Sequence, residues 1–144
     1  MTNKNYIDSY KKASNSMDLV KSSHDIIREL MSHLVNSMNR IVIDIQELKS
    51  NNFESKNLSK KDFALKKSKN MTKSLSIIYG LQTCLDFDKA PEIAGNLFQL
   101  YEFTRQKIIS SLTSKNPEGI NQAISIIQEI LDGWQNIPLE ERKL

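Results

Sequence analysis

The sequence is poor in the residues that punctuate or cross-link a chain. It has one cysteine, Cys84, with four glycines and three prolines among 144 residues. A single cysteine excludes an intramolecular disulfide and a cysteine-rich zinc site. So few turn residues argue against a β-sandwich or barrel. No apolar run approaches the roughly 20 residues that span a bilayer, and the first residues lead into no signal-peptide core, so we expect a cytoplasmic protein without membrane insertion.

The common catalytic and cofactor motifs are also missing. The sequence holds no HExxH, CxxC, GxxxxGK, GxGxxG or GxSxG string, which removes the usual signatures of hydrolases, redox proteins and nucleotide-binding proteins. His24 and His33 stand nine residues apart on one predicted helix, so they fall on different turns and cannot share a metal without help from elsewhere. Cys84 lies between Leu81 and Leu85, where a free cysteine usually acts as a small buried hydrophobe. We therefore expect no enzyme, no metal and no cofactor.

The residues that are present suit one globular domain. Hydrophobic residues make up 39% and charged residues 26% of the chain, which is ordinary for a folded domain of this length. Seven lysines lie from Lys56 to Lys73, with Asp62 as the one acidic residue among them. Such a segment is either a nucleic-acid footprint or a solvated helix face. Arginine occurs in the first hundred residues only as Arg28 and Arg40, which favours the solvated face and no nucleic-acid partner.

Helical periodicity dominates the chain. Between residues 22 and 50, apolar residues recur in steps of three or four, which predicts one buried helical stripe: Ile27, Leu30, Leu34, Met38, Ile41, Ile45 and Leu48. Further helices are predicted over 58–85, 90–114 and 117–136, the last two opened by prolines in their first turns. We predict an all-α fold, an antiparallel four-helix bundle forming one domain over 1–144, with an N-terminal arm or short extra helix at 1–20.

The second and third predicted helices differ in their apolar surface. The second has few inward residues in its lysine-rich half, and those expected inward are Leu65, Met71, Leu75, Ile78 and Leu85. The third has two apolar rows, one of Ile93, Leu97, Leu100, Thr104 and Ile108 and another of Ala94, Phe98, Tyr101, Ile109 and Leu112. One row fills a seam between helices, so the other must be covered by a further helix or by a partner.

The third predicted helix carries a family resemblance. Residues 85–103 read LDFDKAPEIAGNLFQLYEF, which resembles the hallmark of the flagellar secretion chaperones (FliS), where a Leu-Asp pair leads through a short turn to Glu-Ile-Ala, Asn-Leu and Leu-Tyr. Tyr6 and Tyr10 are similar to the paired tyrosines of that family's N-terminal arm, and the closing helix resembles the family's through Ile127, Leu131 and Trp134. The first helix departs from the family pattern, which implies a divergent member.

The resemblance implies a function. A FliS chaperone binds the disordered C-terminal segment of flagellin in the cytosol, prevents premature polymerisation and delivers it to a component of the flagellar type III export apparatus. A bundle with surplus apolar surface suits such a role, because grooves of this kind receive amphipathic segments. The alternative is a helical-bundle adaptor, or a chaperone of another secretion system, that binds an amphipathic partner segment.

The resemblance and the apolar rows together select the candidate binding residues. The residues expected to contact cargo are Ile93, Leu97, Leu100, Tyr101 and Thr104. The residues expected to cover that surface when cargo is absent are Tyr6, Ile7 and Tyr10.

Overall fold

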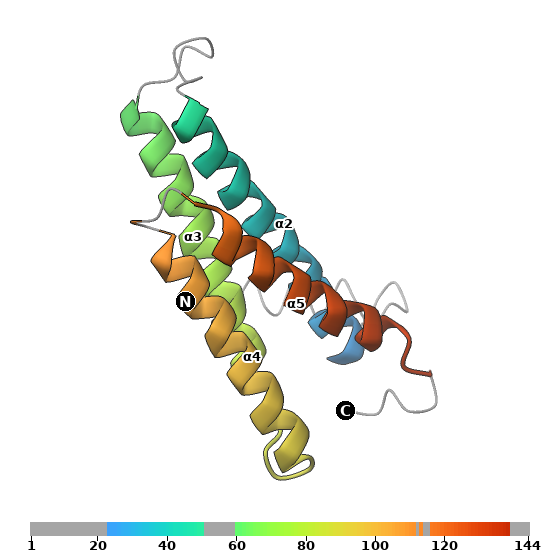
Figure 1. Ribbon diagram of the computed structural model, residues 1–144. Coiled ribbons are helices and arrows are strands. Elements are labelled where there is room, and N and C mark those ends of the chain that lie inside the picture. Colours follow the sequence, from blue (N-terminus) through green and yellow to red (C-terminus); the bar gives the residue numbers. More distant parts are fainter. Residues whose placement is uncertain (1–22, 51–59, 112, 114–115, 139–144) are drawn as a thin grey trace, which may run out of the picture.

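Four helices make up the described protein. The computed structural model describes residues 23–50, 60–111, 113 and 116–138; the predicted arm at 1–20, Leu112 and the side chain of Leu48 lie outside this description. The helices are α2 (Ser23–Ser50), α3 (Lys60–Thr83), α4 (Pro91–Ser110) and α5 (Glu118–Gln135). Each runs antiparallel to the next (Figure 1). The predicted all-α four-helix bundle is confirmed.

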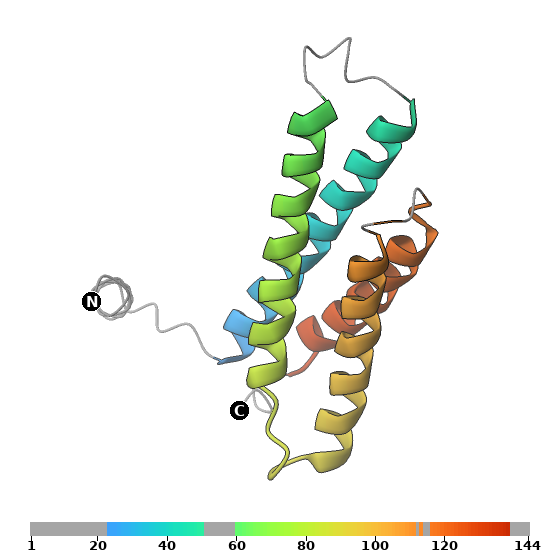
Figure 2. The ribbon, with the colours of Figure 1, turned by 90° about the vertical axis from the view of Figure 1, so that its left-hand side faces the viewer.

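The helices form a longer pair, α2 and α3, and a shorter pair, α4 and α5. The longest helices, α2 and α3, lie along one another, while α5 packs on α2, and α4 contacts both α3 and α5. Figure 2 shows α2 and α3 rising beyond the ends of α4 and α5. The half of α3 that carries the lysines therefore has α2 as its main neighbour.

The core of α2 follows the predicted helical stripe, and α5 adds a second buried face. In α2 the residues Leu34, Met38, Ile41 and Ile45 are buried, and Ile27 and Leu30 pack against them half-buried. The buried face of α5 has the same spacing and consists of Ile120, Ala123, Ile127 and Leu131. Steps of three and four residues keep these side chains on one face of each helix, which is why the periodicity predicted the core.

A chain of polar groups interrupts the seam between α2 and α3. Ser74 Oγ donates to Ser37 Oγ (2.8 Å), Ser37 Oγ to the Asn70 carbonyl (3.2 Å), and Asn70 Nδ2 to Asp44 Oδ2 (2.9 Å). Burial raises the pKa of Asp44, while the hydrogen bond from Asn70 opposes that rise. These groups meet their partners in only one register of the two helices. The polar seam therefore favours that register of α2 against α3.

One predicted inward position is wrong, and the two predicted rows of α4 are only partly buried. Leu65 of α3 is 60% exposed rather than buried. It precedes Met71 by six residues, about one and two-thirds helical turns, which places it a third of a turn away from the core face. In α4 the buried residues are Ala94, Tyr101, Thr104 and Ile108, drawn from both predicted rows. The core face of α4 therefore runs between the rows and leaves apolar residues exposed on either side.

The helix ends follow from local hydrogen bonds. The helix predicted to reach residue 114 ends at Ser110, because the N–H and hydroxyl of Ser111 both bond to carbonyls of the last turn. Serine hydroxyls compete in this way with helix propagation. Before α5, Asn116 Oδ1 accepts a hydrogen bond from the Glu118 N–H (3.0 Å), which gives the first N–H of this helix a partner.

Candidate partner-binding groove

A groove opens at the end of the bundle where α2 and α4 begin and α3 and α5 end. Figure 1 shows α4 and α5 separating toward this end. The groove holds about 330 Å³, and we call it the terminal groove. Its lining residues are mostly apolar and comprise Ser23, Ile26, Ile27, Leu81, Cys84, Leu85, Asp86, Lys89, Ala90, Ile93, Ala94, Leu97, Tyr101 and Trp134.

The turn between α3 and α4 forms one edge of the terminal groove. Asp86 Oδ1 accepts hydrogen bonds from the backbone N–H groups of Asp88 and Lys89, both at 3.0 Å. This side-chain turn brings the chain round to Pro91, which starts α4 because the first turn needs no N–H there. Asp86 and Lys89 thereby give an otherwise apolar groove one acidic and one basic group.

The α4 side of the groove grades from exposed to buried. Ile93 is 64% exposed, Leu97 is half-buried and Tyr101 is 2% exposed. They stand at intervals of four residues, so they follow one edge of α4 into the bundle. Burial, with a smaller effect of Cys84, raises the pKa of Tyr101 to about 12. The phenol is therefore neutral at physiological pH, and the deep end of the groove carries no charge from it.

The structure brings three of the predicted cargo residues together in the groove, namely Ile93, Leu97 and Tyr101. Leu100 is half-buried outside the lining. Thr104 is fully buried, and its hydroxyl donates to the Leu100 carbonyl (3.0 Å). The predicted covering residues Tyr6, Ile7 and Tyr10 lie outside the described residues.

Sequence reasoning missed several groove residues. Cys84, expected to be a small buried hydrophobe, is exposed and lines the groove. Cys84 directly follows the last residue of α3, Thr83, whose hydroxyl donates to the Gly80 carbonyl (2.8 Å). Ser23 and Ile26 lie beside the predicted stripe of the first helix, and no pattern in the sequence indicated that they line a groove.

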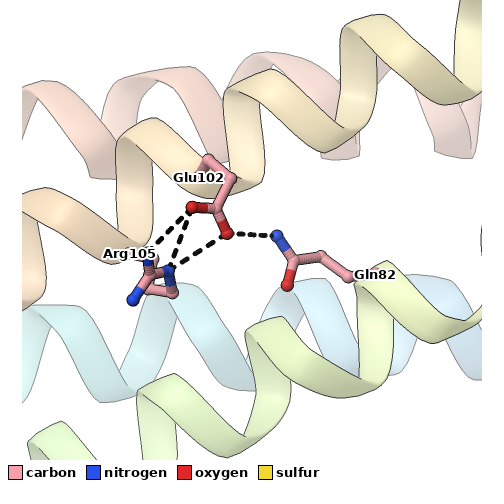
Figure 3. A network of polar contacts seen from close by, with 3 residues as sticks. All are labelled: Gln82, Glu102 and Arg105. Carbon is pink, nitrogen blue, oxygen red and sulfur yellow. Dashed lines mark hydrogen bonds and ion pairs between the residues drawn. The ribbon is translucent and has the colours of Figure 1, made fainter.

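A polar network joins α3 to α4 beside the groove (Figure 3). Gln82 Nε2 donates to Glu102 Oε1 (2.8 Å), and the Arg105 guanidinium holds both carboxylate oxygens of Glu102 at 2.9–3.2 Å. The hydrogen bond from Arg105, followed by that from Gln82, lowers the pKa of Glu102. Gln82 and Glu102 adjoin the lining residues Leu81 and Tyr101, so the hydrogen bond between them joins α3 to α4 next to the groove.

The composition of the terminal groove suits an amphipathic peptide segment. Across the described ranges, no three His, Cys, Asp or Glu side chains are grouped so as to hold a metal. None of the helices in those ranges is long and apolar enough to cross a bilayer. An apolar lining with a few polar groups at its edge is typical of grooves that receive the apolar face of an amphipathic segment.

Comparison with known proteins agrees with the resemblance of the third helix. The chain is 29% identical over 139 residues to the flagellar secretion chaperone FliS of Vibrio cholerae, covering 96% of this chain and 92% of that protein. It is 32% identical over 65 residues to the flagellar secretion chaperone FliSB of Pseudomonas aeruginosa, covering 45% of this chain and 52% of that one. The FliS chaperone of Salmonella typhimurium matches at 28% identity over 72 residues, 49% of this chain and 53% of its own.

The family model described as flagellar protein FliS matches residues 6–141. That span includes all four helices and the whole lining of the terminal groove. The chain therefore belongs to the FliS family of flagellar secretion chaperones.

Proposed function

We propose that this protein is an export chaperone that binds the disordered C-terminal segment of flagellin in the cytoplasm, prevents its premature polymerisation and delivers it to a component of the flagellar export apparatus. It acts by binding alone, as one folded unit of residues 1–144, with no catalytic step and no nucleic-acid partner. Membership of the FliS family and the printed names of the relatives support this assignment.

The terminal groove is the observation that carries the proposal. Ile93 is 64% exposed at its mouth, although it belongs to a helix whose neighbouring face is buried. An exposed large aliphatic side chain next to an apolar groove is the feature expected of a surface that a partner covers. An amphipathic cargo segment would place its apolar face there and leave its polar face in water.

The proposed cargo contacts follow the α4 edge of the groove. Ile93, Leu97 and Tyr101 make the first contacts, since they line the groove already. Leu100 extends the contact along α4, and Thr104 joins only where cargo displaces the groups that bury it. Several modest contacts over a long segment suit a cargo that must later be released, because ordering a disordered segment consumes part of the binding free energy.

We also propose that the N-terminal arm covers the groove when cargo is absent, through Tyr6, Ile7 and Tyr10. Ser23, the first described residue, lines the groove, and the arm precedes it directly in the sequence. From Tyr10 to Ser23 the chain spans 13 residues, whose extended reach of roughly 3.3 Å per residue exceeds the size of the groove.

Co-purification tests the proposed function. The tagged protein is expressed with flagellin of the same organism, either full-length or lacking its C-terminal segment. Full-length flagellin should co-purify and stay monomeric, and truncated flagellin should not. Equal recovery of both flagellins, or recovery of nucleic acid in place of flagellin, would contradict the proposal.

A further inference from the structure

A reciprocal contact joins the start of α2 to the end of α5. The His24 Nε2 atom lies 2.6 Å from the Trp134 carbonyl oxygen, and Trp134 Nε1 donates to the His24 carbonyl (2.9 Å). The two rings stack nearly parallel, with centroids 5.1 Å apart and planes inclined by 8°. Two hydrogen bonds and a ring stack between the same two residues form a clasp, which we call the His24–Trp134 clasp.

The clasp requires a proton on the Nε2 atom of His24. A carbonyl oxygen only accepts hydrogen bonds, so Nε2 must carry the proton. In the neutral ring Nδ1 is then a bare acceptor, and it is buried without a hydrogen-bond partner among the described residues, with Asp25 Oδ1 at 3.9 Å. A side chain that only filled space would not need to bury a polar atom in this way. The imidazole is instead the donor that meets the end of α5.

The clasp stands directly behind the terminal groove. Trp134 is the one α5 residue in the described lining, while Ser23 and Ile26, on either side of His24 and Asp25, line the groove from α2. His24 itself is buried and does not line it. At this end α5 has separated from α4 (Figure 1), so its last turn depends on contacts with α2. The His24–Trp134 clasp supplies these contacts at the residue with which α5 lines the groove.

We infer that His24 is a positioning residue for the partner-binding groove: its imidazole donates to the Trp134 carbonyl and stacks on the indole, and so holds Trp134 as the α5 side of the groove, although His24 touches no partner. This inference rests on the proposed function only where it concerns partner affinity. The placement of Trp134 is a property of the free protein. Trp134 is the single tryptophan of the chain, so its fluorescence reports on the clasp without interference.

Two substitutions separate the two halves of the clasp. His24→Phe keeps a ring for stacking and removes the donor, whereas His24→Gln keeps an N–H donor of similar reach and removes the ring. We expect His24→Phe to shift Trp134 emission to longer wavelength and to increase its quenching by acrylamide. Affinity for a synthetic flagellin C-terminal segment should fall by about fivefold to tenfold, the effect of one net hydrogen bond, with part of it restored in His24→Gln.

Matched controls distinguish positioning from general loss of stability. His33→Phe changes an exposed histidine of the same helix, and Met38→Ala removes a buried core side chain of α2 that is not among the groove residues. Measured in the folded state, both should keep the emission and affinity of the unaltered protein. The inference is overturned if His24→Phe leaves emission and affinity unchanged, or if Met38→Ala weakens binding as much as His24→Phe does.

Measurements on the unaltered protein test the His24–Trp134 clasp even if His24→Phe does not fold. Nitrogen NMR of the imidazole should find the proton of His24 on Nε2, and the indole N–H of Trp134 should exchange slowly with solvent. Exchange as fast as that of a free indole would overturn the clasp. If the unaltered protein binds no flagellin segment, the proposed function fails, while emission and exchange still decide whether His24 positions Trp134.

Discussion

Single residues of the terminal groove divide into those that build the bundle and those that face a partner. Ile93 is mostly exposed, so Ile93→Ala should change the free energy of unfolding by no more than about 0.5 kcal/mol. Tyr101 is buried, and Tyr101→Ala should cost about 3–5 kcal/mol, as for other large aromatic truncations. Half-buried Leu97→Ala should fall between them. Urea unfolding of the three variants tests this order, and equal losses for Ile93→Ala and Tyr101→Ala would contradict the assignment.

The buried phenol of Tyr101 predicts how stability changes in alkali. Its pKa rises from 10.0 to about 12 on folding, so the folded state holds the proton more tightly than the unfolded chain does. The corresponding stability is fully present below pH 10 and is lost as pH rises from 10 toward about 12. Tyr101→Phe lacks this ionisation, so its free energy of unfolding should fall less between about pH 9 and about pH 11. Urea unfolding measures this free energy for both proteins. Equal declines with pH would rule out a buried phenol.

The buried carboxyl of Asp44 leads us to expect that a substitution there stabilises the protein. Burial raises the pKa of Asp44 above its ordinary 3.8, so the folded state favours the protonated form, and stability is lost as pH rises through the folded pKa. Asp44→Asn mimics that neutral form, and its side-chain oxygen can still accept from Asn70 Nδ2. The variant should be more stable than the unaltered protein at neutral pH. In thermal melts below pH 3.8 the two proteins should be equally stable. A less stable Asp44→Asn variant at neutral pH would show that the charge of Asp44 is stabilising.

At the scale of whole elements, the sequence predicted that four helices exist but not always which side of each is buried. Steps of three and four residues in α2 left one possible core face. In α3, Leu65 is expected inward, but its six-residue distance from Met71 turns it outward. In α4 two rows competed, and the buried face lies between them because α3 and α5 approach that helix from different sides. Such choices depend on the neighbouring helices, which local periodicity does not contain.

The arm at 1–20 yields the prediction that belongs to this scale. If Tyr6, Ile7 and Tyr10 cover the terminal groove, removing residues 1–15 should expose its apolar lining and increase the fluorescence of a hydrophobic dye. Far-UV circular dichroism should show the four helices intact. A triple variant with serine at positions 6, 7 and 10 is the matched control for chain length, and it should bind the dye as the truncated protein does. Dye binding equal to that of the full chain would favour an arm that leaves the groove uncovered.

At the scale of the molecule, the terminal groove exists only because the starts of α2 and α4 meet the ends of α3 and α5. The resemblance of residues 85–103 selected Ile93, Leu97 and Tyr101, which do line the groove. It did not select Ser23, Ile26 or Cys84, because their place in the lining depends on how α2 and α3 meet at that end. The contact between His24 and Trp134 spans 110 residues of chain, so no local pattern could have indicated it.

Binding of a synthetic flagellin C-terminal segment to two surface variants tests the central claim, that partner binding takes place in the terminal groove. Ile93 and Tyr79 are matched controls for one another, since they are 64% and 70% exposed and only Ile93 lines the groove. Calorimetric titration should give an affinity at least about tenfold weaker for Ile93→Asp than for the unaltered protein, because a charge replaces an apolar anchor. Tyr79→Asp should bind within about twofold of the unaltered protein, as expected of a residue outside the interface. Equal affinities for the two variants, or a larger loss for Tyr79→Asp, would contradict the account.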